Sequence, residues 1–219
     1  MGPRPSGGHI GVFRFAGWVA ARGGLATVDP MSTAPTPPPI DDKDWTWVLE
    51  RPCPECGFEA GTVDASDVAS MLRANAAEWQ DLLRRPDTDR LRARPDAEHW
   101  SALEYACHVR DVFEIYDQRL ALMLAEDGPH YPNWDQDASA VEGRYDQADP
   151  GEVAAQLMAA GLRLAARFDT VGSYQWARTG FRGDGARFTV ETFARYFIHD
   201  PVHHLDDVAK GFVALGDAS

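Results

Sequence analysis

Apolar residues recur at steps of three and four in four stretches of the chain, and this spacing predicts four amphipathic helices. The predicted helices span residues 63–83, 100–125, 149–168 and 188–208. The connections 126–149 and 172–185 contain Gly and Pro, show no sustained period, and predict loops. A loop as long as the first is typically functional or crosses a bundle. The pattern therefore predicts an all-α fold built on a four-helix bundle.

Cap signals mark where three of these helices begin. Ser101 with Glu104 three residues later matches a capping box, in which each side chain accepts a hydrogen bond from the other residue's backbone N–H. Pro150 suits the first position of the third helix, and Thr189 can cap the fourth. Pro201 lies inside the fourth helix and lacks the N–H that would bind the carbonyl four residues earlier. We therefore expect a bend at that turn.

The composition is typical of a soluble globular protein, since 44% of the 219 residues are hydrophobic and 25% are charged. The formal net charge of −13 argues against binding to nucleic acid or to anionic membranes, because their phosphates would be repelled. No apolar run approaches the roughly 20 residues that span a bilayer. The three cysteines follow no disulfide-dense pattern and suit a reducing compartment, so we expect a cytoplasmic protein.

The chain divides by composition into three parts. We expect residues 1–44 to be a disordered or wrongly annotated N-terminal extension. Residues 1–30 are rich in Gly, Arg and Ala, and Met31 precedes a Pro-rich run. The alternative for residues 1–30 is a genuine disordered tail. Residues 45–62 form a cysteine-containing segment that we expect to pack on the bundle. Residues 63–219 form the bundle itself.

The cysteine-containing segment carries Cys53-Pro-Glu-Cys56-Gly57, a knuckle of the kind that supplies half of a zinc-ribbon site. A structural zinc needs four ligands, and the chain has no second Cys-x-x-Cys; the remaining cysteine is Cys107. We therefore favour a tight turn over a zinc site. In this interpretation Trp45 and Trp47 hold the turn against the main body.

The strongest candidate chemistry lies near the C-terminus, where three of the seven histidines cluster. His199 and His203 are four residues apart, so on a helix they share one face with Cβ atoms about 6 Å apart, close enough to bind one metal ion. His204 leaves the helix about 100° away from His203, which argues against binding the same ion. The bend at Pro201 could re-aim His203 or break the spacing. The alternative is that these histidines only pack in the core.

These features resemble the DinB-like superfamily, which includes the metal-binding domain of the mycothiol-dependent maleylpyruvate isomerases and related thiol S-transferases. The resemblance covers about residues 65–215. It is carried by Trp100-Ser101-x-x-Glu104-x-x-x-His108-Val109-Arg110-Asp111 and by His199-Asp200-Pro201-Val202-His203-His204. It implies helices in up-down-down-up order, with the long loop between the second and third. The cysteine knuckle and Pro201 depart from the general pattern.

The resemblance also implies one divalent ion held by His108, His199 and His203. We expect zinc, with nickel, iron or manganese as alternatives. Three neutral imidazoles leave at least one coordination position open for water or a thiol, whose pKa the metal would lower.

Three further residues are candidates around this ion. Asp111 and Asp207 each lie one turn from a predicted ligand and could orient an imidazole through its second nitrogen. Arg195 could bind a substrate carboxylate. The alternatives are solvated surface acids and a surface ion pair.

The function implied by the resemblance is a metal-dependent transferase that activates a low-molecular-weight thiol of the mycothiol type and moves it onto an electrophile. The alternatives are a non-enzymatic or stress-related metal-binding bundle and a zinc-dependent hydrolase. We expect a small-molecule thiol or electrophile as partner. The sequence leaves open whether the chain forms a homodimer. The sequence identifies no catalytic residue beyond the metal ligands.

Overall fold

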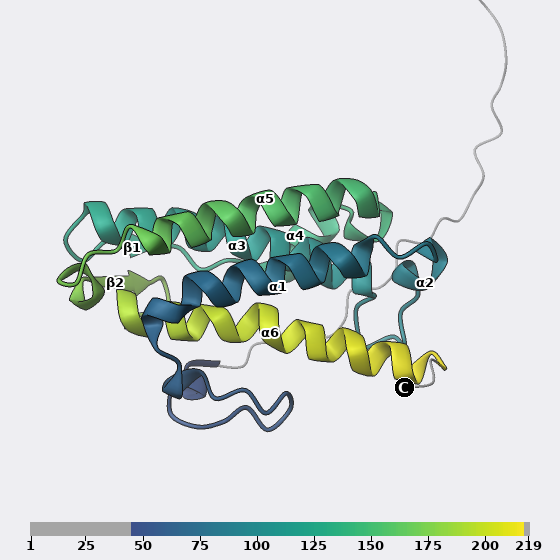
Figure 1. Cartoon of the computed structure of the whole chain (residues 1–219), viewed down its shortest axis with the longest axis horizontal. Helices are drawn as coiled ribbons and strands as arrows, with labels where there is room; N and C mark the ends of the chain where they lie inside the picture. Colours follow the sequence, from purple (N-terminus) through teal and green to yellow (C-terminus); the bar gives the residue numbers. More distant parts are fainter. Residues whose placement is uncertain (1–44, 217–219) are drawn as a thin grey trace, which may run out of the picture. The chain divides into compact units, whose positions relative to one another are not determined.

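The computed structural model describes residues 45–216, so the expectations for residues 1–44 lie outside the described residues. Four long helices form the body: α1 (Val68–Leu83), α3 (Ala102–Ala125), α5 (Pro150–Asp169) and α6 (Val190–Ala214). In Figure 1, α1 and α6 run in one direction and α3 and α5 in the other. The predicted four-helix bundle in up-down-down-up order is thereby confirmed.

The predicted helix starts are also confirmed. Ser101 and Glu104 form the capping box of α3, with the Glu104 carboxylate accepting from the Ser101 N–H at 2.9 Å. Pro150 is the first residue of α5, and the preceding Asp149 caps that helix through its side chain. Thr189 caps α6 in the same way. Local side-chain chemistry therefore sets where these helices begin.

The core lies between the four helices. α5 packs against both α1 and α3, and α6 packs against the same two helices from the other side. Gly161 on α5 permits this close approach, because a Cβ there would lie 2.9 Å from Ala76 Cβ and 3.1 Å from Phe113 Cε2. Trp79 and Phe197 are fully buried in the same core. Within residues 45–216, no helix combines the length and the hydrophobicity needed to cross a membrane.

The two connections predicted as loops contain secondary structure. The first holds β1 (His130–Tyr131), α4 (Gln136–Glu142) and η4 (Tyr145–Gln147). The second holds η5 (Gln175–Ala177), β2 (Thr179–Arg182) and, next to α6, β3 (Arg187–Thr189). β2 pairs parallel with β1 and antiparallel with β3. These strands are too short to show a period in the sequence, which is why the expectation of plain loops was wrong. A short helix, α2 (Thr88–Arg92), joins α1 to α3.

α6 continues through Pro201 without interruption. The Pro201 carbonyl accepts hydrogen bonds from Asn75 Nδ2 at 2.9 Å and from Trp79 Nε1 at 3.4 Å, both on α1. These bonds tie the proline turn to the neighbouring helix. The four-residue spacing of side chains on either side of Pro201 is therefore kept.

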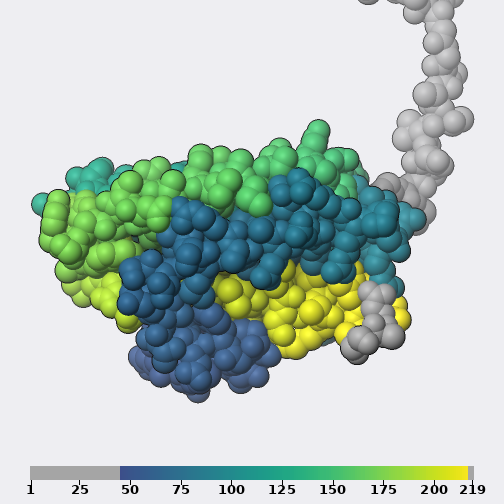
Figure 2. All heavy atoms as spheres, in the orientation of Figure 1, coloured from purple at the N-terminus to yellow at the C-terminus, as the bar shows by residue number. Residues whose placement is uncertain are grey.

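The segment before α1 consists of η1 (Trp45–Leu49), η2 (Ala60–Thr62) and η3 (Ala65–Asp67), joined by the cysteine knuckle. All three short helices contact α6. Figure 2 shows the atoms of this segment, in dark blue, against the yellow surface of α6. Arg195 donates to the Val63 carbonyl at 2.8 Å, and Lys210 donates to the Glu55 carbonyl at 2.8 Å. α6 is thus flanked by α1 and α3 and by the N-terminal segment.

Candidate metal centre

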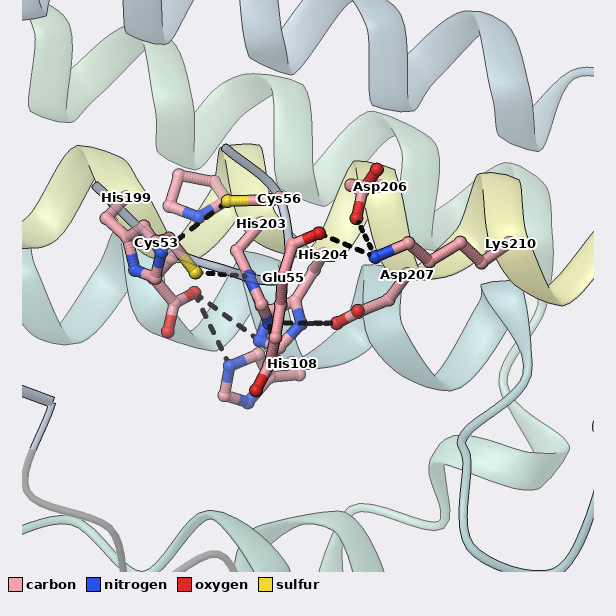
Figure 3. A network of polar contacts seen from close by, with 12 residues as sticks. Cys53, Glu55, Cys56, His108, His199, His203, His204, Asp206, Asp207 and Lys210 are labelled. Carbon is pink, nitrogen blue, oxygen red and sulfur yellow. Dashed lines mark hydrogen bonds and ion pairs between the residues drawn. The ribbon is translucent and has the colours of Figure 1, made fainter. Parts of the chain in front are cut away.

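Residues 199–204 of α6 present potential ligands on two adjacent faces. His199 and His203 share one face, and Asp200 and His204 share the next, about 100° around the helix. Each pair meets different residues from elsewhere in the chain, as Figure 3 shows for the histidines and cysteines. Three groups of ligand atoms result, in each of which all atoms lie within 4.8 Å of one another. One of them, made of His203, His204 and Asp207, bridges the two faces, and the other two lie one on each face. We call these other two the knuckle cluster (Cys53, Cys56, His199 and His203) and the inner triad (His108, Asp200 and His204).

In the knuckle cluster each sulfur faces one imidazole. Cys53 Sγ lies 3.8 Å from His203 Nδ1, and Cys56 Sγ lies 3.7 Å from His199 Nε2. Burial lowers the pKa of His199 to about 4 and also lowers that of His203, so both rings are neutral near pH 7. Burial raises the pKa of the Cys56 thiol to about 11 when no cation is bound. Neutral imidazole is the form of histidine that binds metal.

The inner triad joins α3 to α6. His108 Nε2 lies 3.5 Å from Asp200 Oδ1, and His204 Nε2 lies 3.9 Å from the same oxygen. The rings of His108 and His204 have centroids 4.9 Å apart and are nearly perpendicular. His108 is 1% exposed, yet neither of its ring nitrogens has a hydrogen-bond partner within the described part of the chain. Asp200 Oδ1 is unpartnered there in the same sense. A buried polar group left in this state costs about 1–3 kcal/mol, which a bound cation would offset.

Neighbouring side chains hold the inner triad in place. His204 Nδ1 lies 2.9 Å from Asp207 Oδ2, so a proton on Nδ1 would leave the Nε2 lone pair facing Asp200. Burial opposes the charged form of Asp200, but the nearby imidazoles of His108 and His204 more than offset this and lower its pKa to about 2. The Trp134 ring stacks on His108 at a centroid distance of 5.2 Å. These contacts orient two imidazoles and keep one carboxylate ionised.

A cavity of about 740 Å³ lies beside the inner triad. Asp200, His204 and Asp207 line it together with side chains from the N-terminal segment and from the loop before α5. Among the other lining residues are Trp45, Glu55, Tyr116, Arg119, Trp134 and Arg182. The inner triad offers three ligands beside this cavity, whereas the knuckle cluster offers four. His199 and His203 of the knuckle cluster also line the cavity, whereas His108 does not. The difference between the two sites is the number of ligands, because three protein ligands leave a coordination position open and four do not.

The structure does not bring the three predicted ligands together. His199 and His203 face the cysteine knuckle, while His108 faces Asp200 and His204. The predicted direction of His204, about 100° from His203, is the reason, because that face of α6 is the one turned toward α3. Metal binding by His108, His199 and His203 stays a prediction from sequence, and the geometry favours dividing these residues between two sites.

Of the other predicted site residues, Asp111 and Arg195 lie apart from the ligand groups, whereas Asp207 lies beside them. The Asp111 carboxylate is bound by Arg110 and by the Tyr145 hydroxyl, and no contact joins it to an imidazole among the described residues. Arg195 pairs with Glu191 and holds the N-terminal segment instead of lining the cavity. Asp207 contacts both groups, since its Oδ2 also lies 3.5 Å from His203 Nε2.

Four residues of the two groups were not predicted as ligands: Cys53, Cys56, Asp200 and His204. Their signals are present in the sequence. Asp200 and His204 are four residues apart, just as His199 and His203 are. Cys-x-x-Cys and His-x-x-x-His together have the ligand spacing of a Cys₂His₂ zinc site, although the two halves lie far apart in the chain.

Comparisons with known proteins agree with this fold. A family model described as the DinB superfamily matches residues 71–208. Among solved structures, the chain is similar to YfiT from Bacillus subtilis, described as a probable metal-dependent hydrolase with an unusual four-helix bundle topology. That likeness has a TM-score of 0.63 and 19% sequence identity, and covers 70% of this chain and 89% of YfiT. No curated protein matches the sequence. Since the family match spans more than half of the chain, including His108 and the ligand-bearing turns of α6, the chain belongs to the DinB superfamily.

Proposed function

We propose that this chain is a metal-dependent enzyme in which His108, Asp200 and His204 hold one divalent ion beside the cavity. The buried His108 carries this proposal, because its Nε2 lies 3.5 Å from Asp200 Oδ1 and its ring nitrogens have no closer hydrogen-bond partner among the described residues. An imidazole that only packed in the core would be expected to donate or accept at least one hydrogen bond. Two imidazoles and one carboxylate suit zinc, and they also suit Fe²⁺ or Mn²⁺.

The surrounding residues support catalysis better than simple metal storage. A divalent ion in such a site makes a thiolate or hydroxide available near neutral pH. Asp207 fixes the His204 ring, and Trp134 covers one side of His108. The cavity of about 740 Å³ lies within the roughly 300–1,000 Å³ range of small-molecule sites. Asp200 and His204 line this cavity, so a substrate that enters it can approach the ion that the triad would hold.

We infer that the nucleophile is a low-molecular-weight thiol of the mycothiol type, which the enzyme transfers to an electrophile. Arg119 on the cavity wall supplies positive charge suited to an anionic group on either substrate, whereas the neighbouring Arg182 already pairs with Asp184. The cavity volume is sufficient for parts of both substrates at once. This reaction needs no base to activate a water molecule, and the thiol proton would pass to solvent because a bound metal lowers the thiol pKa.

Hydrolysis is the second candidate. YfiT, which shares the fold, is described as a probable metal-dependent hydrolase. A hydrolase needs a general base near the metal, and Glu55 and Asp207 place carboxylates on the cavity wall. A third candidate, a metal-binding protein without catalytic activity, would use the same triad.

The test combines metal analysis with two assays. The metal-loaded protein is incubated with an alkylating electrophile with and without mycothiol, and separately with ester and amide substrates without thiol. Thiol-dependent product supports transfer, thiol-independent product supports hydrolysis, and neither product with metal bound supports the non-catalytic alternative.

Variants then assign the site. His108→Ala and His204→Ala should each remove one metal equivalent and the activity. The control is His130→Ala, because His130 is an exposed histidine on β1 that stacks on Phe181 away from both groups. Full metal content in both triad variants would contradict the proposal.

A further inference from the structure

The knuckle cluster supplies no ligand to the proposed active-site ion, although His199 and His203 line the same cavity, and it lies on the neighbouring face of α6. We propose that Cys53, Cys56, His199 and His203 bind a structural zinc ion that fastens the segment 45–62 to α6. The site would be a closed Cys₂His₂ centre. It would be separate from the divalent ion of the inner triad.

The distances fit a zinc tetrahedron. Zn–S bonds of about 2.3 Å and Zn–N bonds of about 2.0–2.1 Å at tetrahedral angles place sulfur and nitrogen about 3.6 Å apart. The two sulfur–nitrogen contacts measure 3.8 Å and 3.7 Å. Cys53 faces His203 and Cys56 faces His199, so each sulfur–nitrogen contact joins the cysteine knuckle to α6. All four ligand atoms lie within 4.8 Å of one another and therefore surround one common point.

The chemistry of the ligands also selects zinc. Two thiolates and two imidazoles form a closed four-coordinate set, which is typical of structural zinc and leaves no position for substrate. Cys53, His199 and His203 are at most 6% exposed. Trp45 covers the imidazoles, with ring centroids 5.7 Å from His199 and 5.4 Å from His203. Three of the four ligands are thus buried, while Cys56 is half-buried and the two imidazoles border the cavity.

The knuckle backbone is shaped to present both sulfurs. The Gly57 N–H donates to the Cys53 carbonyl at 2.8 Å, and the Cys53 N–H donates to the Phe58 carbonyl at 2.9 Å. Gly57 has φ +74°, a left-handed conformation that favours glycine. The side chains of both cysteines consequently point to α6 from one tight turn (Figure 3).

The N-terminal segment has little hydrophobic core of its own. Within 45–62 the buried hydrophobic residues are Val48, Cys53 and Ala60, too few to form a core. With so little core of its own, the segment depends on its contacts with α6, which a shared metal ion would strengthen. The family match begins at residue 71, so the knuckle lies outside the part of the chain that defines the superfamily.

The zinc site would also build the neighbouring cavity. Glu55 lies between the two cysteines and Trp45 covers the imidazoles, and both side chains line the cavity beside the inner triad. Glu55 Oε2 lies 3.5 Å from His203 Nε2. Fastening the knuckle to α6 therefore fixes one wall of the proposed active site.

The experiment uses the full chain loaded with Co²⁺ or Zn²⁺. We expect two metal equivalents per chain in the unaltered protein and one in the double variant Cys53→Ser/Cys56→Ser. Thiolate-to-cobalt absorption should be present in the unaltered protein and lost in the double variant. The matched control is Cys107→Ala, since Cys107 is buried on α3 outside both groups and its variant should keep the absorption. Limited proteolysis should cut within 45–62 faster in the double variant than in the control.

A second measurement uses the unaltered protein, so its result does not depend on whether the double variant folds. In the unaltered zinc protein, titrating thiols with an organomercurial should release one zinc ion as Cys53 and Cys56 react. Reaction of both thiols without zinc release would overturn the proposal, as would a Cys53–Cys56 disulfide in the purified protein. The result is independent of the proposed function, because His204→Ala should remove the other ion and leave the thiolate absorption intact.

Discussion

The two faces of α6 between residues 199 and 204 differ by a single residue step, yet they meet different surroundings. His199 and His203 face a short segment that supplies two sulfurs, giving four ligands and no open coordination position, and both imidazoles also border the cavity. Asp200 and His204 face α3, which supplies His108, and a cavity occupies the remaining side. The comparison teaches that a four-residue spacing identifies a ligand pair but not its role. The partners that pack against each face decide whether a site can be structural or catalytic.

The largest expected effect comes from substituting the two adjacent histidines separately. His203→Ala should remove the knuckle zinc and lower the melting temperature by about 10 °C, because loss of a structural site removes several kcal/mol and each kcal/mol shifts a chain of this size by about 2–4 °C. His204→Ala should instead lower activity by about 100-fold or more, since even outer partners of a ligand contribute about 10–100-fold.

Metal content, cobalt absorption and thermal melting measured on both variants check this pair. A loss of thiolate absorption in His204→Ala would show that the two faces share one ion. The same conclusion would follow if His203→Ala lost activity and kept its full stability.

A pH titration of the metal-free protein separates the two faces in a second way. The pKa of His199 is about 4 in the folded protein because burial disfavours its charged form, and about 6.5 when unfolded. The unfolded chain therefore binds more protons between these values, so the free energy of unfolding should fall as pH drops from about 6.5 to about 4, by at most about 3 kcal/mol. His199→Gln should flatten this dependence.

Denaturant unfolding at several pH values measures the slope. The matched comparison is His130→Gln, which changes an exposed histidine and should leave the slope unchanged. Equal slopes in the unaltered protein and in His199→Gln would mean that burial of the knuckle cluster does not govern the acid sensitivity.

Asp207 lies between the faces and should show an intermediate effect. Asp207→Asn weakens the acceptor for His204 Nδ1, so we expect metal affinity at the inner triad to fall by about 10–100-fold. The knuckle zinc should change less, because the contact from Asp207 to His203 is longer, at 3.5 Å. Competition with a chromophoric chelator measures both affinities, and an equal loss at the two sites would contradict the assignment of Asp207 to His204.

The smallest effect is expected at Trp134. Trp134→Leu removes the ring stacked on His108, a contact worth about 0.5–1.5 kcal/mol, so metal affinity at the triad should fall by roughly 2- to 10-fold. The cobalt–thiolate absorption of the knuckle cluster should stay unchanged. Isothermal titration with zinc or cobalt checks this result, and a loss of affinity larger than that of Asp207→Asn would reverse the expected order.

Much of the bundle was predictable because its signals are local. The capping box at Ser101 and Glu104, the proline that begins α5 and the cap at Thr189 act within one helical turn. The strands of β1, β2 and β3 were missed because two to four residues carry no periodicity and pair only once the helices are in place.

The sequence by itself determined the four helices, their order and the presence of ligand pairs on α6, since these depend on residues close together in the chain. Tertiary structure decided which ligands meet. Cys53 and His203 are 150 residues apart, and Cys56 and His199 are 143 apart. A rotation of α6 by one residue, about 100°, would turn Asp200 and His204 toward the knuckle or, in the opposite sense, His199 and His203 toward α3. That rotation is fixed by packing against α1, α3 and the N-terminal segment, which no local pattern encodes.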